Sequence, residues 1–86
     1  MKVRIRSWKS MEKEFELNKE GDIVINKQIH FAKNMNYLCN KTVKLKKVID
    51  NFIKIYELDE GWIISEEMIK KKDRKKFRKY LEKHHV

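Results

Sequence analysis

The chain has 86 residues, of which 41% are apolar and 41% are charged, and its formal net charge is +9. This length fits one small domain with a marginal core, and the absence of Pro excludes collagen-like and Pro-rich disordered classes. A single cysteine excludes an internal disulfide and a zinc site built from several thiolates. No apolar run approaches the roughly 18 residues that cross a bilayer, so we expect a soluble cytoplasmic protein without a secretion signal.

The first fifteen residues predict a strand followed by a short helix. Residues 1–6 alternate between charged and apolar side chains, which is typical of a half-buried strand. Ser7 can cap the helix that follows, because its hydroxyl can accept a hydrogen bond from a free N–H group in the first turn. Apolar residues then recur at helical spacing, as Trp8, Met11 and Phe15. We expect this stripe to pack on the central sheet.

The next segment predicts mixed structure. Gly21 is expected to end the helix in a left-handed conformation, and residues 22–26 form a short strand or an extended loop. One or two helical turns follow, marked by apolar spacing at Phe31, Met35 and Leu38. We expect Asn40 to end these turns as a left-handed cap, Cys39 to be a small buried hydrophobe, and His30 to lie at the surface.

A meander of three strands forms the predicted centre of the fold. The strands are expected at Thr42–Ile49, Phe52–Leu58 and Trp62–Ser65, because turn-forming residues separate them at 50–51 and 59–61. A bent meander with an earlier strand is typical of an α+β fold built on a small SH3-like antiparallel barrel. The sequence therefore predicts an SH3-like barrel over residues 1–69.

The apolar pattern within the three strands predicts which side chains face inward. The apolar phase changes after Lys46, which predicts a β-bulge in the first strand. In the second strand, alternation places Ile53 and Ile55 inside and Tyr56 outside. Ile63 alternates with its apolar neighbours, so we expect the third strand to be covered on both sides.

Most of the positive charge lies in residues 70–86, which we expect to form a basic helical extension. This segment holds nine Lys/Arg and two acids, a net +7, whereas residues 1–69 hold thirteen and eleven, a net +2. The cations are Lys70, Lys71, Lys72, Arg74, Lys75, Lys76, Arg78, Lys79 and Lys83. Phe77, Tyr80 and Leu81 recur at helical spacing, so the extension is an amphipathic helix that docks on the barrel, pairs with another subunit, or folds on a partner.

Clustered cations predict an anionic partner. They gain free energy by releasing counterions from phosphate, and such contacts read no base sequence. The outward faces of the first two long strands can add Lys2, Arg4, Arg6, Lys44 and Lys46. We therefore predict binding to nucleic acid or to a ribonucleoprotein; a solubilising lysine-rich tail stays open as the alternative. No membrane partner is expected, because the apolar face of the helix is narrow.

No arrangement of residues predicts an enzyme, a metal or a cofactor. The two glycines stand far apart, so no phosphate-binding loop exists. His30 lacks the two further ligands that a metal site would need nearby. His84 and His85 form a pair at the C-terminal end, which we expect to be frayed. We expect a binding protein without catalytic activity.

Four motifs resemble a family of small uncharacterised phage and prophage proteins of low-GC Gram-positive bacteria. The motifs are V-R-I-R-S-W-x-x-M-E, G-D-I, F-x-x-x-M-x-Y-L-C-x-K-T and G-W-x-I-S-x-E-M-I, and they span residues 3–69. Two departures stand out: Asn40 replaces the family's Gly, and the family ends soon after E-M-I. The resemblance implies a phage origin and a bacterial host cell. It also raises an alternative function, a protein inhibitor of a bacterial defence system that acts by steric blocking, as some anti-CRISPR proteins do.

Overall fold

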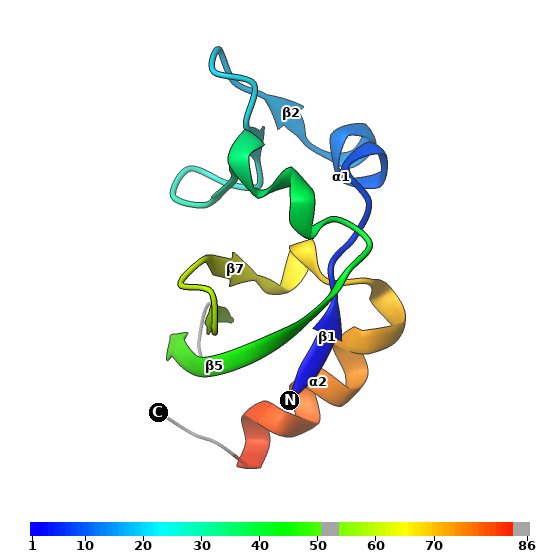
Figure 1. Ribbon diagram of the computed structural model, residues 1–86, viewed down its shortest axis with the longest axis vertical. Helices are drawn as coiled ribbons and strands as arrows, with labels where there is room; N and C mark the ends of the chain where they lie inside the picture. Colours follow the sequence, from blue (N-terminus) through cyan, green and yellow to red (C-terminus); the bar gives the residue numbers. More distant parts are fainter. Residues whose placement is uncertain (51–53, 84–86) are drawn as a thin grey trace.

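The computed structural model describes residues 1–50 and 54–83 of the chain, without the side chains of residues 81 and 82. The predictions for Asn51, Phe52, Ile53, the Leu81 side chain and the two C-terminal histidines lie outside the described residues. The fold is α+β, as predicted. It combines a curled antiparallel sheet, a short helix near the N-terminus and a longer helix near the C-terminus (Figure 1).

The main sheet has four strands in the order β1-β5-β6-β7. Their bounds are β1 Lys2–Arg4, β5 Thr42–Asp50, β6 Ile55–Leu58 and β7 Ile63–Ser65. All neighbours are antiparallel, and an isolated bridge from Ile5 to Ile69 extends the pairing beyond β1. The predicted meander is confirmed by β5 and β7, and the second predicted strand is found at Ile55–Leu58, with Lys54 in the turn before it. The predicted β-bulge is also confirmed, because the pairing register shifts between Leu45 and Lys47.

The remaining elements lie between β1 and β5 or follow β7. Helix α1 is Trp8–Glu14, a small second sheet pairs β2 Glu16–Leu17, β3 Ile23–Val24 and β4 His30–Phe31, and a 3₁₀ helix η1 covers Lys33–Leu38. A 3₁₀ turn η2, Glu66–Met68, leads from β7 towards α2, Lys71–Lys83. None of the helices within the described residues is long and apolar enough to cross a membrane.

Helix α1 begins as predicted and ends earlier than predicted. The Ser7 hydroxyl accepts a hydrogen bond from the Ser10 N–H at 3.1 Å, which confirms the cap. The helix ends at Phe15, whose backbone is extended, and the chain enters β2. Gly21, with a φ of 86°, therefore does not end the helix but lies in the turn between β2 and β3. The Asn18 side chain organises that turn by accepting hydrogen bonds from the Glu20 and Asp22 N–H groups.

The segment before β5 confirms one cap and corrects one helix start. Ile23 and Val24 form a strand, which decides between the two alternatives for residues 22–26. Phe31 is buried on strand β4, so the predicted helical turns begin only at Lys33. Asn40 follows η1 with a φ of 65°, the left-handed conformation expected of it.

We expect Asn40→Ala to lower the free energy of unfolding by about 1 kcal/mol, whereas Asn40→Gly leaves it nearly unchanged. In the left-handed region alanine has an unfavourable steric energy of about 1–2 kcal/mol. Glycine has no such energy, and for asparagine it is smaller. The backbone contacts of Asn40 to Ile5 and Arg4 remain possible in both variants. Urea denaturation measures the difference; an alanine variant as stable as the glycine variant would contradict it.

Three predictions about side-chain facing in the meander are wrong. Ile55, predicted to face inward, is only half-buried and is not part of the core, because alternation along β6 turns Tyr56 and Leu58 inward instead. Tyr56 is fully buried rather than outward, because β6 pairs Leu58 with Leu45 and so turns both Leu58 and Tyr56 to the core. A second register shift between Val48 and Asp50 precedes this stretch. Ile63 is 51% exposed, so β7 is not covered on both sides.

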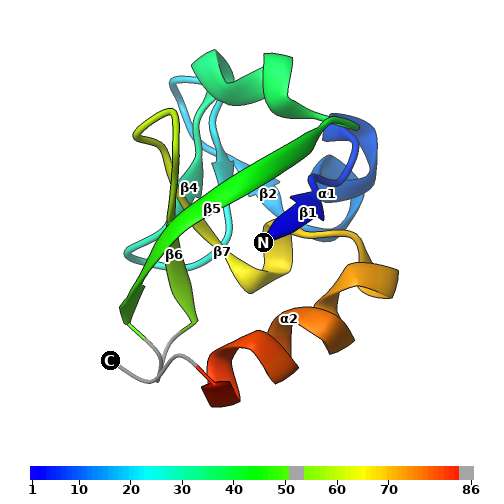
Figure 2. The same ribbon diagram turned by 60° about the horizontal axis from the view of Figure 1, so that its bottom comes forward.

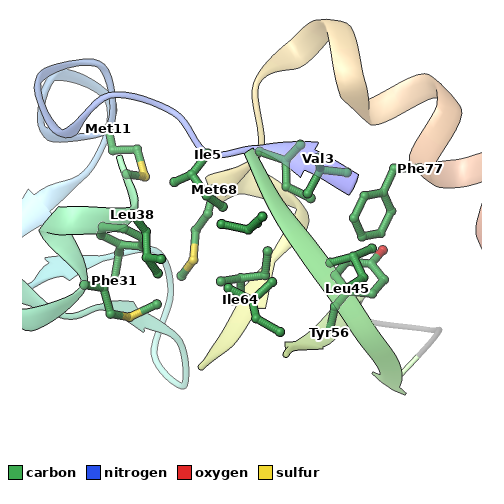
Figure 3. Packing of buried hydrophobic residues seen from close by; sticks show 14 of the residues in the cluster. Val3, Ile5, Met11, Phe31, Leu38, Leu45, Tyr56, Ile64, Met68 and Phe77 are labelled. Carbon is green, nitrogen blue, oxygen red and sulfur yellow. The ribbon is translucent and has the colours of Figure 1, made fainter. Parts of the chain in front are cut away.

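The core is continuous from the small sheet to α2 (Figure 3). At one end Met11, Leu38 and Phe31 meet, and at the other Leu45 and Tyr56 meet Phe77 of α2. Phe77 is 0% exposed, and its ring stands edge-on to Tyr56 with 3.9 Å between ring centroids. Of the three alternatives for the basic helix, docking on the sheet is therefore the one found.

Candidate polyanion-binding face

All six lysines of α2 are exposed and lie on one side of the helix. They are Lys71, Lys72, Lys75, Lys76, Lys79 and Lys83. At about 100° per residue these positions fall within an arc of roughly 140°, on the side opposite the buried Phe77. We call this arc the lysine face. Because α2 docks through the buried Phe77, the exposed lysine face lies on the side of the helix away from the core. Figure 2 shows α2 lying along one side of the main sheet.

The arginines that were predicted to join the lysines are engaged within the fold. Arg74 donates from Nε to the Ile69 carbonyl at 3.0 Å and from Nη2 to the Glu67 carbonyl at 3.2 Å. Arg78 donates from Nε to Glu66 at 2.8 Å. Guanidinium groups present several fixed donors, which suits them to hold carbonyl and carboxylate oxygens in place. Arg74 and Arg78 thus fix α2 to the turn that precedes it.

Arg6 is not on an outward face, contrary to the prediction. Arg6 is only 8% exposed. The guanidinium donates to the Ser10 hydroxyl and carbonyl and to the Glu67 carbonyl, and Nη1 lies 2.8 Å from Glu14. The alternation of residues 1–6 fails there because β1 ends at Arg4, and the chain turns towards α1. Arg6 is therefore a structural residue that joins α1 to η2.

Lys70 occupies an intermediate position before the first turn of α2. Its backbone N–H donates to the Arg4 carbonyl at 2.9 Å, and the residue is half-buried. It borders an open groove of about 480 Å³ between α1 and α2, lined by Arg6, Ser7, Ser10, Glu14 and Lys70–Lys72. Glu14 neutralises Arg6 in this groove, so the remaining charge comes from the three lysines.

The outer face of the sheet adds a second set of cations, as predicted. In the register of β1 and β5, Lys2 lies opposite Lys44 and Arg4 opposite Thr42. Like charges directly opposite each other cost some stability. The Lys44 ammonium lies 3.9 Å from Asp59 and its side chain is 63% exposed. The structure thus brings these two strands' cations together.

Further along β5, one acid serves two lysines. Lys46 and Lys47 both lie 3.9 Å from Glu57, and both are exposed. Lys47 was not among the predicted outward cations. The sequence predicted a bulge near this position but not the strand pairing that turns Lys47 outward. Strand β1 lies between β5 and α2 (Figure 2), and Arg4 accepts from Lys70 and donates its N–H to Asp73 at 2.8 Å. The strand cations therefore adjoin the helix.

Glu66 is the acid that most strongly supports the docked helix. Burial opposes its ionisation, but the hydrogen bond from Arg78 and the charges of Lys54, Arg78 and Arg74 outweigh that effect and hold the pKa of Glu66 below its ordinary value. Glu66 also lies 3.7 Å from Lys54. The carboxylate consequently joins α2 to the chain before β6.

A pH dependence follows from this lowered pKa. A carboxyl whose pKa is lower in the folded state contributes stability above its unfolded pKa and loses it as the pH falls through the folded value. We therefore expect the wild type to lose more thermal stability than Glu66→Gln when the pH falls from about 6 to about 3. Melting temperatures at several pH values measure this. Glu20→Gln, which changes an exposed acid in the β2–β3 turn, serves as the control and should follow the wild type.

Metal ligands and the cysteine were the other candidate groups in the part of the chain that the structure describes. That part contains no group of three His, Cys, Asp or Glu residues that could hold a metal ion. Burial raises the pKa of the Cys39 thiol, which disfavours the reactive thiolate. Comparisons with protein-family models, curated proteins and solved structures found no match to this chain. The resemblance to phage proteins thus stays a prediction.

Proposed function

We propose that this protein is a non-enzymatic binding protein that takes nucleic acid, or the exposed RNA of a ribonucleoprotein, on the lysine face. The observation that carries the proposal is the division of cations on α2. The arginines are engaged with the protein's own oxygens, whereas all six lysines point outward. Lys76, at 3.8 Å from Asp73, is the lysine of the face with an ion pair among the described residues. That pair is long and the Lys76 side chain is 56% exposed, so all six lysines can contact phosphate.

The strand cations extend the same surface. Lys2 lies opposite Lys44 on β1 and β5, and Arg4, whose Nε donates to the Asn40 carbonyl at 3.0 Å, follows on β1. Strand β1 lies beside α2 (Figure 2). Contacts of this kind fix a nucleic acid by its backbone and carry no base specificity. We further propose that the protein acts in the cytoplasm of a bacterial host as a phage-type protein, and that its curled sheet is related to the SH3-like barrels.

Charge neutralisation on the lysine face tests the proposal. Three lysines of the face, Lys71, Lys75 and Lys79, lie in one row at four-residue spacing. We expect the triple variant Lys71→Gln, Lys75→Gln, Lys79→Gln to bind a labelled oligonucleotide at least tenfold more weakly than the wild type does. Fluorescence anisotropy at fixed salt measures the affinity. The substituted side chains are exposed, so the melting temperature should change little.

The matched control removes the same charge elsewhere. Lys19, Lys27 and Lys33 are exposed in the part of the chain at the opposite end from α2 (Figure 1). Their triple glutamine variant has the same net charge as the test variant. Equal loss of affinity in both variants would show that net charge alone, and not the lysine face, attracts the oligonucleotide.

A protein partner is the second candidate, and one observation favours it. Ile63 is 51% exposed on β7, which is the last strand of the main sheet. An apolar side chain at a sheet edge suits a protein contact. On this alternative the protein acts as an anti-CRISPR-like inhibitor by steric blocking. A pull-down from nuclease-treated host lysate tests it, because a protein inhibitor retains its partner without nucleic acid.

A further inference from the structure

A groove with mixed apolar and cationic walls lies beside the lysine face. Its volume is about 360 Å³, and it is lined by Met1, Lys76, Lys79, Tyr80 and Lys83. We call it the Tyr80 groove. The volume falls in the range of about 300–1,000 Å³ that is usual for small-ligand sites. The groove is therefore large enough for one planar ring and the groups attached to it.

The two kinds of wall come from different parts of the fold. Met1 precedes β1 and packs against the core, and Tyr80 is half-buried on α2. These residues supply a thioether and an aromatic ring. Lys76, Lys79 and Lys83 belong to the lysine face and are all exposed. An apolar surface thus lies directly beside three ammonium groups.

This combination selects among anionic ligands. A simple polyanion needs only the lysines and makes no use of the apolar wall that Met1 and Tyr80 supply. A nucleotide of a single strand has both parts, a planar base that stacks on aromatic rings and phosphates that pair with cations. The bases of a duplex are already stacked on each other and present their edges, not their faces, to a protein. The groove is therefore complementary to an unpaired base.

We infer that the Tyr80 groove holds one unpaired base of a single-stranded nucleic acid, with the neighbouring phosphates on Lys76, Lys79 and Lys83. The inference rests on the proposed function and adds to it the strandedness of the ligand. It makes base stacking a source of affinity that is separate from the charge of the lysine face.

The first experiment uses the wild-type protein and three labelled probes of equal length. They are a single-stranded oligodeoxynucleotide, an abasic single strand with the same number of phosphates, and a duplex. Stacking of one base contributes about 1–3 kcal/mol, so we expect the oligodeoxynucleotide to bind about 5- to 150-fold more tightly than the abasic strand. Equal affinities for those two probes, or tighter binding of the duplex, would overturn the inference while leaving the lysine face in place. Failure to bind any of the probes would overturn the proposed function as well.

Variants of Tyr80 then locate the stacking surface. Tyr80→Phe keeps the ring, and we expect it to keep the preference for the strand with bases. Tyr80→Leu keeps apolar volume for packing but removes the planar ring, and we expect it to bind both single strands with the affinity that the wild type has for the abasic one. A leucine variant that retains the wild-type preference would overturn the inference. If that variant does not fold, the wild-type comparison of probes still decides the matter.

Discussion

Phe77→Ala is expected to lower the free energy of unfolding by about 3–5 kcal/mol, because it empties a fully buried site in the core. Phe77 is 0% exposed and its ring contacts Tyr56. A domain of this size has a total stability of the order of 5–15 kcal/mol, so the loss is a large fraction of the whole. Urea denaturation followed by tryptophan fluorescence measures it, since Trp8 and Trp62 both pack against the core.

A matched variant separates packing from the identity of the ring. Phe77→Leu leaves a smaller cavity, and we expect it to lose less stability than Phe77→Ala. Removal of residues 71–86 deletes Phe77 and the ion pair of Arg78, so we expect the remaining chain to be largely unfolded. A truncated chain that unfolds cooperatively at the wild-type temperature would show that α2 is not needed for the core.

This expectation bears on how binding is tested. Truncation at residue 70 removes the lysines and a part of the core together, so a loss of binding after truncation has two explanations. Glutamine substitutions on the lysine face avoid the difficulty, because those side chains are exposed. Binding is therefore better tested with point substitutions on the lysine face than with truncation at residue 70.

Local signals in the sequence predicted the features that depend on one or two residues. Ser7 caps α1 because its hydroxyl reaches a nearby N–H. Asn40 adopts the left-handed conformation because its side chain tolerates it. The bulge in β5 was visible as a change of apolar phase. Each of these is determined within a few neighbouring residues.

Features that depend on pairing between distant strands could not be predicted from the local sequence. Tyr56 faces the core because Leu58 pairs with Leu45, a relation between two strands that the alternation of one strand does not contain. Gly21 lies in a hairpin turn because β2 pairs with β3. In both cases the local pattern allowed two phases, and tertiary pairing chose between them.

The candidate site shows the same division. The spacing of Phe77 correctly placed the lysines of α2 on the outward side of an amphipathic helix. The sequence did not separate Arg6 from the outward cations, because its partners Ser10 and Glu67 are brought to it by α1 and η2. Charge counts locate a basic segment, whereas the fold decides which of its cations are available.

The affinity for a single-stranded oligonucleotide is expected to fall about 300-fold between roughly 50 and 200 mM salt. Binding to phosphate releases counterions, and for single strands the slope of log K against log salt is about −0.7 for each phosphate neutralised. The six lysines of the face give a slope of about −4. Fluorescence anisotropy titrations at several salt concentrations measure this slope.

The triple variant of Lys71, Lys75 and Lys79 turns the slope into a count of contacts. Three lost contacts reduce the slope to about −2, so the same change in salt weakens binding only about 20-fold. The Lys19, Lys27 and Lys33 control should keep the wild-type slope, because those residues lie at the far end of the molecule. A protein partner held at Ile63 by apolar contacts would show little salt dependence in any variant. A steep wild-type slope that the lysine-face variant alone reduces therefore favours phosphate contact over steric inhibition, and a flat slope in all three proteins favours the reverse.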